Sequence, residues 1–165
     1  MSREKKVLIY GYGNPGRRDD GMGIKITEMI EEWKNAHNLF QIDTDSNYQL
    51  NVEDAEKISQ YDIVIFADAS QETNLTNFRF TKVEPNEQQV EFTMHAVSPA
   101  YIVHLCQKLF HKKPAANLLS MKGYRWEFEE GISDHALLNL ERAFIFLQCQ
   151  LQNMLAIEFS EIKCN

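Results

Sequence analysis

The chain has 165 residues, of which 44% are hydrophobic and 25% are charged, and its formal net charge is −7. This length suffices for one domain with a buried core, so we expect a single domain over residues 1–165. The acidic composition argues against a general nucleic-acid binder, which normally carries a basic face. The sequence offers neither a signal peptide nor a stretch long enough to span a membrane. We therefore expect a cytoplasmic protein, taken as a monomer, with neither nucleic acid nor a membrane as a partner.

The three cysteines are scattered along the second half of the chain. They are Cys106, Cys149 and Cys164, an odd number without a Cys-x-x-Cys pair. This spacing indicates free thiols in a reducing cytoplasm.

The first predicted elements are a strand over residues 6–11 and a helix that ends near Ala36. The strand is indicated by four consecutive residues with strong β tendency, from Val7 to Tyr10. Asp20 or Gly21 is expected to cap the helix, because a carboxylate accepts the free amide protons at a helix start. The apolar residues that recur at spacings of three and four are Met22, Ile26, Met29, Ile30 and Trp33.

A second short strand is expected over Leu39–Ile42, followed by the polar segment 43–48. Residues 51–59 are typical of a short helix with Asn51 as a possible cap. The most continuous apolar run is Ile63–Ala67, which predicts a central parallel strand covered on both faces.

The second half continues the alternation of strands and helices. Residues 77–83 alternate between apolar and polar side chains, which predicts a half-exposed edge strand. Ser98-Pro99 is expected to open a helix, with serine as the cap and proline at the first helical position. A strand over Leu118–Lys122 and a long last helix capped by Ser133 or Asp134 follow. The pattern predicts an α/β fold, with about five mostly parallel strands in one twisted sheet and helices on both faces.

The segment after the first strand, Gly11-x-Gly13-x-x-Gly16, matches the dinucleotide-binding fingerprint. In that motif a pyrophosphate lies at a helix N-terminus, where Asp19 and Asp20 would here place negative charge. Asp43, at the end of the second strand, could serve as the ribose-binding acid, so this alternative stays open.

The run Gly-x-Gly-Asn-Pro-Gly also resembles the opening of peptidyl-tRNA hydrolase. That family follows it with a histidine-bearing segment, where this chain has Arg17-Arg18-Asp19-Asp20. An acidic chain is also a poor partner for tRNA.

A third resemblance covers about residues 6–145 in ordered blocks. Gly-x-Gly-Asn-Pro, continued by Asp-Asp-Gly-x-Gly, is similar to the hydrogenase maturation proteases, which trim the C-terminus of [NiFe]-hydrogenase large-subunit precursors. Further blocks that resemble this family are Gln49–Ile58 with Tyr61–Ala69, His95-Ala96-Val97-Ser98-Pro99, Leu118–Tyr124 and Phe128–Ser133. The chain departs from the family's pattern in segment 43–48, which is polar and has no glycine. The resemblance therefore does not imply which large subunit the chain serves.

The resemblance implies that Asp20, Asp68 and His95 are the catalytic and metal-binding residues. The residues support this independently, since Asp20 and Asp68 follow predicted parallel strands and His95 precedes a helix at the same sheet edge. Two carboxylates and an imidazole bind Zn²⁺, Ni²⁺ or Mn²⁺ and leave positions open for water or substrate.

The resemblance further implies an aspartyl-type, metal-dependent endopeptidase that recognises nickel already inserted in its precursor. The nickel would then be the substrate's metal, with Zn²⁺ or Cd²⁺ able to replace it in a crystal. A metal-sensing or assembly protein that binds the precursor without cutting it remains the alternative from a different functional class.

Other residues near the glycine loop are assigned supporting or no roles. Asp19 is expected to support the loop rather than bind metal, and Arg17 and Arg18 are expected to be solvated. Neither Gly-x-Ser-x-Gly nor His-Glu-x-x-His occurs, so neither a serine triad nor a zincin is indicated.

Overall fold

Strands and helices alternate along the chain, as the sequence predicts. The computed structural model describes residues 3–87, 97–162 and 164. In chain order the elements are β1 (Val7–Tyr12), the 3-10 turn η1 (Arg18–Gly21), α1 (Met22–Ala36), β2 (Ile42–Asn47), α2 (Asp54–Ile58), β3 (Ile63–Ser70), β4 (Phe78–Lys82), α3 (Pro99–Phe110), β5 (Ala115–Lys122) and α4 (Asp134–Leu155).

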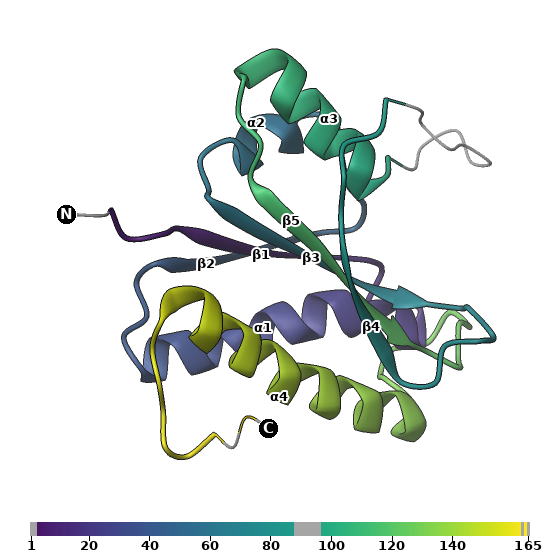
Figure 1. Cartoon of the computed structure of the whole chain (residues 1–165). Coiled ribbons are helices and arrows are strands. Elements are labelled where there is room, and N and C mark those ends of the chain that lie inside the picture. Colours follow the sequence, from purple (N-terminus) through teal and green to yellow (C-terminus); the bar gives the residue numbers. More distant parts are fainter. Residues whose placement is uncertain (1–2, 88–96, 163, 165) are drawn as a thin grey trace.

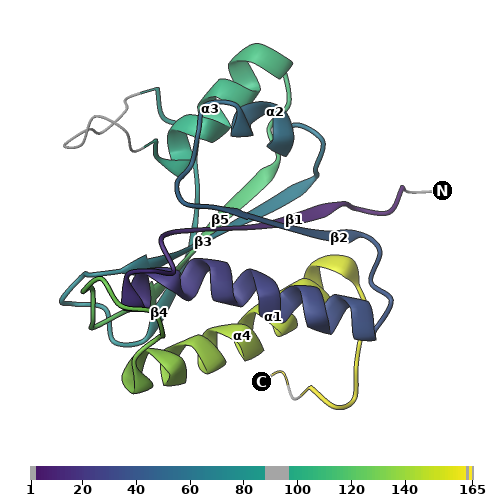
Figure 2. The ribbon, with the colours of Figure 1, turned by 180° about the vertical axis from the view of Figure 1, so that it is seen from behind.

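The strands form one sheet in the order β2-β1-β3-β5-β4. All neighbouring pairs are parallel except β4 with β5, where β4 is an antiparallel edge strand. Helices α1 and α4 cover one face of the sheet, and α2 and α3 cover the other (Figures 1 and 2). The predicted α/β class, the mostly parallel five-stranded sheet and the edge strand near residues 77–83 are therefore confirmed.

Alternation of side chains along the central strands builds two cores. In β1, Val7 and Ile9 pack with α1 and α4, whereas Leu8 and Tyr10 pack with α2 and α3. Strand β3 alternates in the same way, because successive side chains of a strand point to opposite faces. The helices bury one face each, and within the described residues none has the combination of length and apolar character needed to cross a membrane.

The second strand begins at Ile42, the residue at which the predicted strand ends. The predicted bounds Leu39–Ile42 were wrong, since β2 runs through the polar residues from Ile42 to Asn47. β2 lies at the sheet edge and pairs in register with β1, from Ile42 opposite Val7 to Asn47 opposite Tyr12. An edge strand needs backbone pairing on one side only and tolerates polar side chains, so its composition resembles that of a loop.

The predicted helix caps are only partly confirmed. Ser98 caps α3, because its Oγ accepts a hydrogen bond from the Tyr101 N–H at 3.1 Å, and Pro99 is the first helical residue. The side chain of Asp20 does not cap α1, whose N-cap position is Gly21. Asn51 does not cap α2 either, since its backbone N–H donates to the carboxylate of Asp54 inside that helix.

Two of the three cysteines form a disulfide, which corrects the prediction of three free thiols. Cys149 in α4 is bonded to Cys164, whereas Cys106 is free and buried. After Ala156 the chain turns back, and Phe159 packs edge-on against Trp33 of α1 with ring centroids 6.1 Å apart. Only this reversal brings the two cysteines together, so their sequence spacing carried no sign of the pair.

Reduction of the disulfide is expected to lower the free energy of unfolding by up to about 3 kcal/mol, the value for a loop of this length. The cross-link closes a loop between residues 15 positions apart, which limits the conformations of the unfolded chain. Urea unfolding with and without a reductant measures the difference, and Cys164→Ser serves as the control that should no longer respond to the reductant. Equal stability in all conditions would contradict the expectation.

Candidate functional site

The strand order reverses at the carboxyl ends of β1 and β3. From β1 the chain moves to β2 on one side, then returns to place β3 on the other side of β1. Open α/β sheets bind ligands in the crevice at such a point, because the connections leave the sheet in opposite directions there. Asp20 follows β1 and Asp68 lies near the end of β3, so both belong to the loops and strand ends at this point.

The glycines near this point allow the start of α1 to lie against the strands. A Cβ on Gly23 would be 2.5 Å from the carbonyl oxygens of Ala67 and Tyr12, a distance that real Cβ atoms do not show. Gly13 has a φ of +140° and a Cβ there would be 2.1 Å from the backbone oxygen of Asp20. The glycine pattern thus serves the close packing of the loop, and this packing fixes the backbone that carries Asp20.

In the glycine loop, the Asp20 carboxylate occupies the position at which a bound anion would accept hydrogen bonds from the backbone. The Asn14 N–H donates to Asp20 Oδ2 at 2.9 Å, and the Gly16 N–H donates to Asn14 Oδ1 at 2.9 Å. In a dinucleotide-binding loop such amides would instead face a pyrophosphate. The local hydrogen bonds therefore disfavour the dinucleotide interpretation and hold one oxygen of Asp20 in place.

Asp68 extends the series of β3 side chains that face α2 and α3. Val64 and Phe66 pack in that core, and Asp68 follows two residues later at the strand end. Burial, together with the negative charge of Asp20, raises the pKa of Asp68 to about 7. Burial and the charge of Asp68 in turn keep the pKa of Tyr12 well above its ordinary value. The two carboxylates are thus coupled electrostatically across the ends of β1 and β3.

Asp68→Asn is expected to stabilise the metal-free protein at pH 8 by about 1–2 kcal/mol, a value reduced for residual solvent exposure. The folded-state pKa of about 7 lies above the ordinary value of 3.8 for an aspartate. Ionisation of Asp68 therefore opposes folding increasingly between these two values and fully above pH 7, whereas below pH 3.8 the penalty is absent. Denaturant unfolding of the wild type and of Asp68→Asn at pH 8 and pH 4 measures the difference in their free energies of unfolding. A variant that is less stable than the wild type at pH 8 would contradict this expectation.

Asp20 and Asp68 form a donor set that suits a cation, because a positive charge would offset the repulsion between two carboxylates in a partly buried crevice. Within the described residues, no group of three His, Cys, Asp or Glu side chains lies in an arrangement that could hold a metal ion. The third predicted ligand, His95, lies outside the described residues. The chain re-enters the described part with Val97, which packs in the core beneath α3, and Ser98. The metal-binding role of Asp20, Asp68 and His95 stays a prediction.

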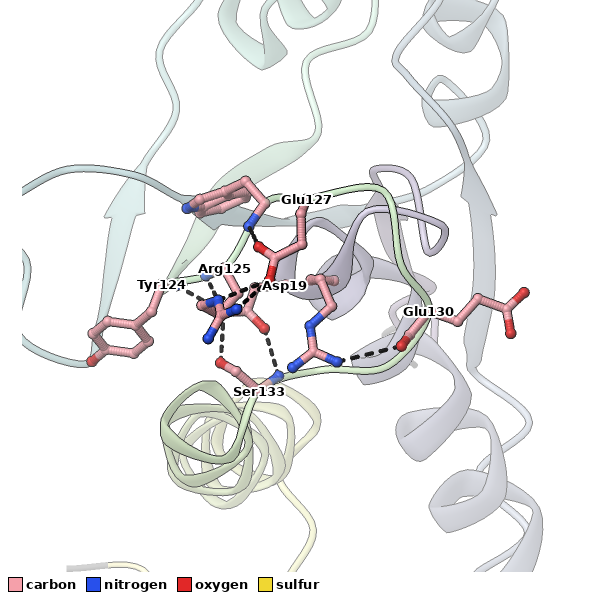
Figure 3. A network of polar contacts seen from close by, with 8 residues as sticks. Asp19, Tyr124, Arg125, Glu127, Glu130 and Ser133 are labelled. Atoms are coloured by element: carbon pink, nitrogen blue, oxygen red, sulfur yellow. Dashed lines mark hydrogen bonds and ion pairs between the residues drawn. The ribbon is translucent and has the colours of Figure 1, made fainter.

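Asp19 organises the loop between β5 and α4, a different loop from the glycine loop that it was expected to support. Its side chain is fully buried and accepts backbone hydrogen bonds from Tyr124 at 2.7 Å, Arg125 at 2.9 Å and Ser133 at 2.7 Å. The Ser133 hydroxyl adds a fourth bond at 2.7 Å (Figure 3). Burial alone would raise the pKa of Asp19, but these hydrogen bonds outweigh it and lower the pKa below the ordinary value.

Arg17 and Arg18 contact the same loop, so the prediction that both are solvated was wrong. Arg17 Nε donates to the Trp126 carbonyl at 3.2 Å, and its guanidinium lies 5.1 Å from the centre of the Phe128 ring. The backbone N–H of Arg18 donates to the Glu129 carbonyl at 2.8 Å. The two arginines therefore fasten the loop over residues 124–133 to the turn that carries Asp20.

Tyr12 and the loop 124–133 belong to the same region as Asp20 and Asp68, although the sequence assigned neither of them a functional role. The loop's composition held a signal, because Tyr124, Trp126 and Phe128 stand close together in a segment where polar residues are usual. Its attachment to η1 depends on contacts between positions more than 100 residues apart, which no local pattern shows.

No family model and no curated protein matches the sequence. The hydrogenase maturating endopeptidase HybD from E. coli is similar in structure, with a TM-score of 0.65, 16% identity, and coverage of 90% of this chain and 93% of that one. The [NiFe] hydrogenase maturation protease HycI from Thermococcus kodakarensis KOD1 gives a TM-score of 0.65, 18% identity and coverage of 88% and 92%. An endopeptidase from Escherichia coli gives a TM-score of 0.69 and 15% identity, with coverage of 90% of this chain and 93% of that one. The chain therefore has the fold of the hydrogenase maturation endopeptidases.

Proposed function

We propose that the protein is an endopeptidase that removes the C-terminal extension of a [NiFe]-hydrogenase large-subunit precursor after nickel insertion. The observation that carries the proposal is the pair Asp20 and Asp68, coupled across the strand-order reversal of a fold found in hydrogenase maturation endopeptidases. Neither the glycine loop nor the fold alone would lead to this function, because both occur with other activities.

In this proposal Asp20, Asp68 and His95 bind the nickel that the precursor carries, so the metal is part of the substrate. Two carboxylates and an imidazole suit a divalent transition metal. Asp20 is oriented for this role by the Asn14 N–H on one of its oxygens. Asp68 has a pKa of about 7 in the metal-free protein, and a bound cation would favour its ionised form.

The described cysteines do not offer a nucleophile for the reaction. Cys149 and Cys164 are bonded to each other, and burial raises the pKa of the Cys106 thiol. A reactive cysteine would instead need a lowered pKa and access to the substrate. We propose accordingly that thiol-directed and serine-directed protease inhibitors leave the activity intact.

The competing proposal is an assembly protein that binds the precursor without cutting it. The two are separated by incubating the protein with a nickel-loaded precursor and measuring the mass of the large subunit. We expect a large subunit shortened at its C-terminus together with a released peptide. An intact precursor that co-purifies with the protein would support the assembly role instead. We further propose that the protein acts as a cytoplasmic monomer. Sedimentation of the purified protein tests whether it is a monomer.

A further inference from the structure

Tyr12 lies beside Asp68 at the carboxyl ends of β1 and β3. In the register of these strands Gly11 is opposite Ala67, and Tyr12 and Asp68 are the next residues of the two strands. The Tyr12 ring packs against the core that α2 and α3 cover, and the alternation along β3 places Asp68 on the same face. The hydroxyl group of Tyr12 is hydrogen-bonded to the Asp68 carboxylate. The two side chains therefore form a pair within the proposed catalytic site.

The Tyr12 hydroxyl acts on Asp68 as a hydrogen-bond donor. A tyrosine hydroxyl carries its proton at neutral pH, so it donates to a carboxylate oxygen. The Ala69 N–H donates to the same carboxylate. An ionised carboxylate offers about four lone-pair sites, so two hydrogen bonds fix its orientation and leave capacity to bind a cation. Tyr12 thus orients Asp68 without using up the oxygen lone pairs that a metal needs.

The backbone of Tyr12 is held by β2 and by α1. Tyr12 is paired with Asn47 of β2, and the Gly13 N–H donates to the Asn47 carbonyl at 3.1 Å. A Cβ on Gly23, at the start of α1, would be 2.5 Å from the Tyr12 carbonyl oxygen and 3.1 Å from its backbone nitrogen. The start of α1 therefore lies directly against Tyr12. A donor held in this way is in place before a metal binds, which lowers the cost of organising the site.

The same short segment holds both carboxylates of the proposed site. The Asn14 N–H donates to Asp20 Oδ2 at 2.9 Å, and the Tyr12 hydroxyl donates to Asp68. We propose that Tyr12 is a positioning residue, which orients Asp68 toward the nickel of the precursor as the Asn14 N–H orients Asp20. The inference rests on the proposed function, because it requires that Asp68 binds this metal.

Tyr10 provides the matched control for Tyr12. It lies two residues earlier in β1, on the same face of the sheet, and its hydroxyl donates to the Asp54 carboxylate at 3.1 Å, outside the proposed site. Tyr12→Phe and Tyr10→Phe each remove one hydroxyl that is bonded to one aspartate. Titration calorimetry of the purified proteins with Ni²⁺ alone should show affinity lowered by about 10–100-fold in Tyr12→Phe, as for other residues that orient a metal ligand. Tyr10→Phe should bind Ni²⁺ as the wild type does, and circular dichroism checks that both variants are folded.

The same two variants are compared in processing of the nickel-loaded precursor. Tyr12→Phe should raise KM by about 10-fold or more, because a less well oriented Asp68 binds the precursor's nickel more weakly, and should change kcat by a smaller factor. Tyr10→Phe should leave both constants at the wild-type value. A loss of stability alone would reduce the amount of active protein and hence the apparent kcat, without a change in KM. The split between the two constants therefore separates a positioning role from a structural one.

The outcomes separate this inference from the proposed function. A wild type that neither binds Ni²⁺ nor cleaves the precursor overturns both. A wild type that binds Ni²⁺ and leaves the precursor intact overturns the proposed function, and the Ni²⁺ affinity of Tyr12→Phe then decides whether Tyr12 orients Asp68. If the wild type cleaves without measurable binding of free Ni²⁺, the comparison of KM values decides.

Three results would overturn the inference and leave the proposed function standing, provided that the wild type cleaves. The first is a Tyr12→Phe variant with the KM and the Ni²⁺ affinity of the wild type. The second is a Tyr10→Phe variant that is impaired as strongly as Tyr12→Phe. The third is a Tyr12→Phe protein that does not fold, because this would assign the hydroxyl to the stability of the fold.

Discussion

Asp68→Asn is expected to reduce processing of the nickel-loaded precursor by more than about 100-fold, since in the proposed mechanism it removes a metal ligand, which exceeds the 10–100-fold effect of a residue that only orients one. The amide keeps the size of the side chain at the end of β3 but removes its negative charge. Asp20→Asn should have a similar effect, because it removes the other carboxylate of the pair Asp20 and Asp68. The rate of appearance of the shortened large subunit measures both variants.

Asp62→Asn is the matched control, because Asp62 lies directly before β3, at the end of this strand opposite to Asp68. Its carboxylate accepts hydrogen bonds from the Lys6 N–H and from Arg3. Its substitution should leave the rate of processing unchanged. Asp68→Asn should also remain folded, as judged by circular dichroism. A variant that is folded and processes the precursor at the normal rate would remove Asp68 from the catalytic site.

Asp19→Ala is expected to lower the free energy of unfolding by about 3 kcal/mol or more, since buried donors that lose their acceptor each cost about 1–3 kcal/mol. The substitution removes the acceptor of three backbone N–H groups and the Ser133 hydroxyl. The loop over residues 124–133 should then exchange its amide hydrogens faster. Denaturant unfolding and hydrogen exchange of the Tyr124, Arg125 and Ser133 amides are the measurements.

The effect of Asp19→Ala should depend on pH with a definite sign. The folded-state pKa of Asp19 lies below the ordinary value of 3.8 for an aspartate. The stability that its ionised form contributes is therefore complete above that value and is lost as the pH falls through the folded-state pKa. The difference from the wild type should shrink in acid, whereas Asp134→Ala, a change at an exposed neighbour of Ser133, should have little effect at any pH. A difference that grows in acid would contradict this account.

Local sequence patterns predicted the centre of the fold well. The apolar run Ile63–Ala67 marks β3 because a strand covered on both faces has to be apolar throughout. Ser98-Pro99 marks the start of α3 because a hydroxyl cap followed by proline satisfies the free amides of a helix start. These signals arise within a few residues of each other and do not depend on the rest of the chain.

The features that the sequence did not predict depend on tertiary contacts. β2 is a strand because β1 lies beside it, and its own residues resemble a loop. The Cys149–Cys164 bond requires the chain reversal after α4. Arg17 and Arg18 were expected in solvent because nothing near them in sequence shows that residues 124–133 return to this point. For the candidate site, the family resemblance implied Asp20 and Asp68, and their positions after predicted strands agreed with it, but their coupling is visible only once β1 and β3 are neighbours.

The measurement that tests the central proposal most directly is the mass of the large-subunit precursor after incubation with the protein, with and without nickel in the precursor. The proposed mechanism predicts cleavage of the nickel-loaded form alone, because the substrate's metal completes the contact with Asp20 and Asp68, whereas a nickel-free precursor leaves the two carboxylates uncompensated. Cleavage of the nickel-loaded form should persist after treatment with a thiol-alkylating agent. Equal cleavage of both forms, or loss of activity on alkylation, would contradict the mechanism.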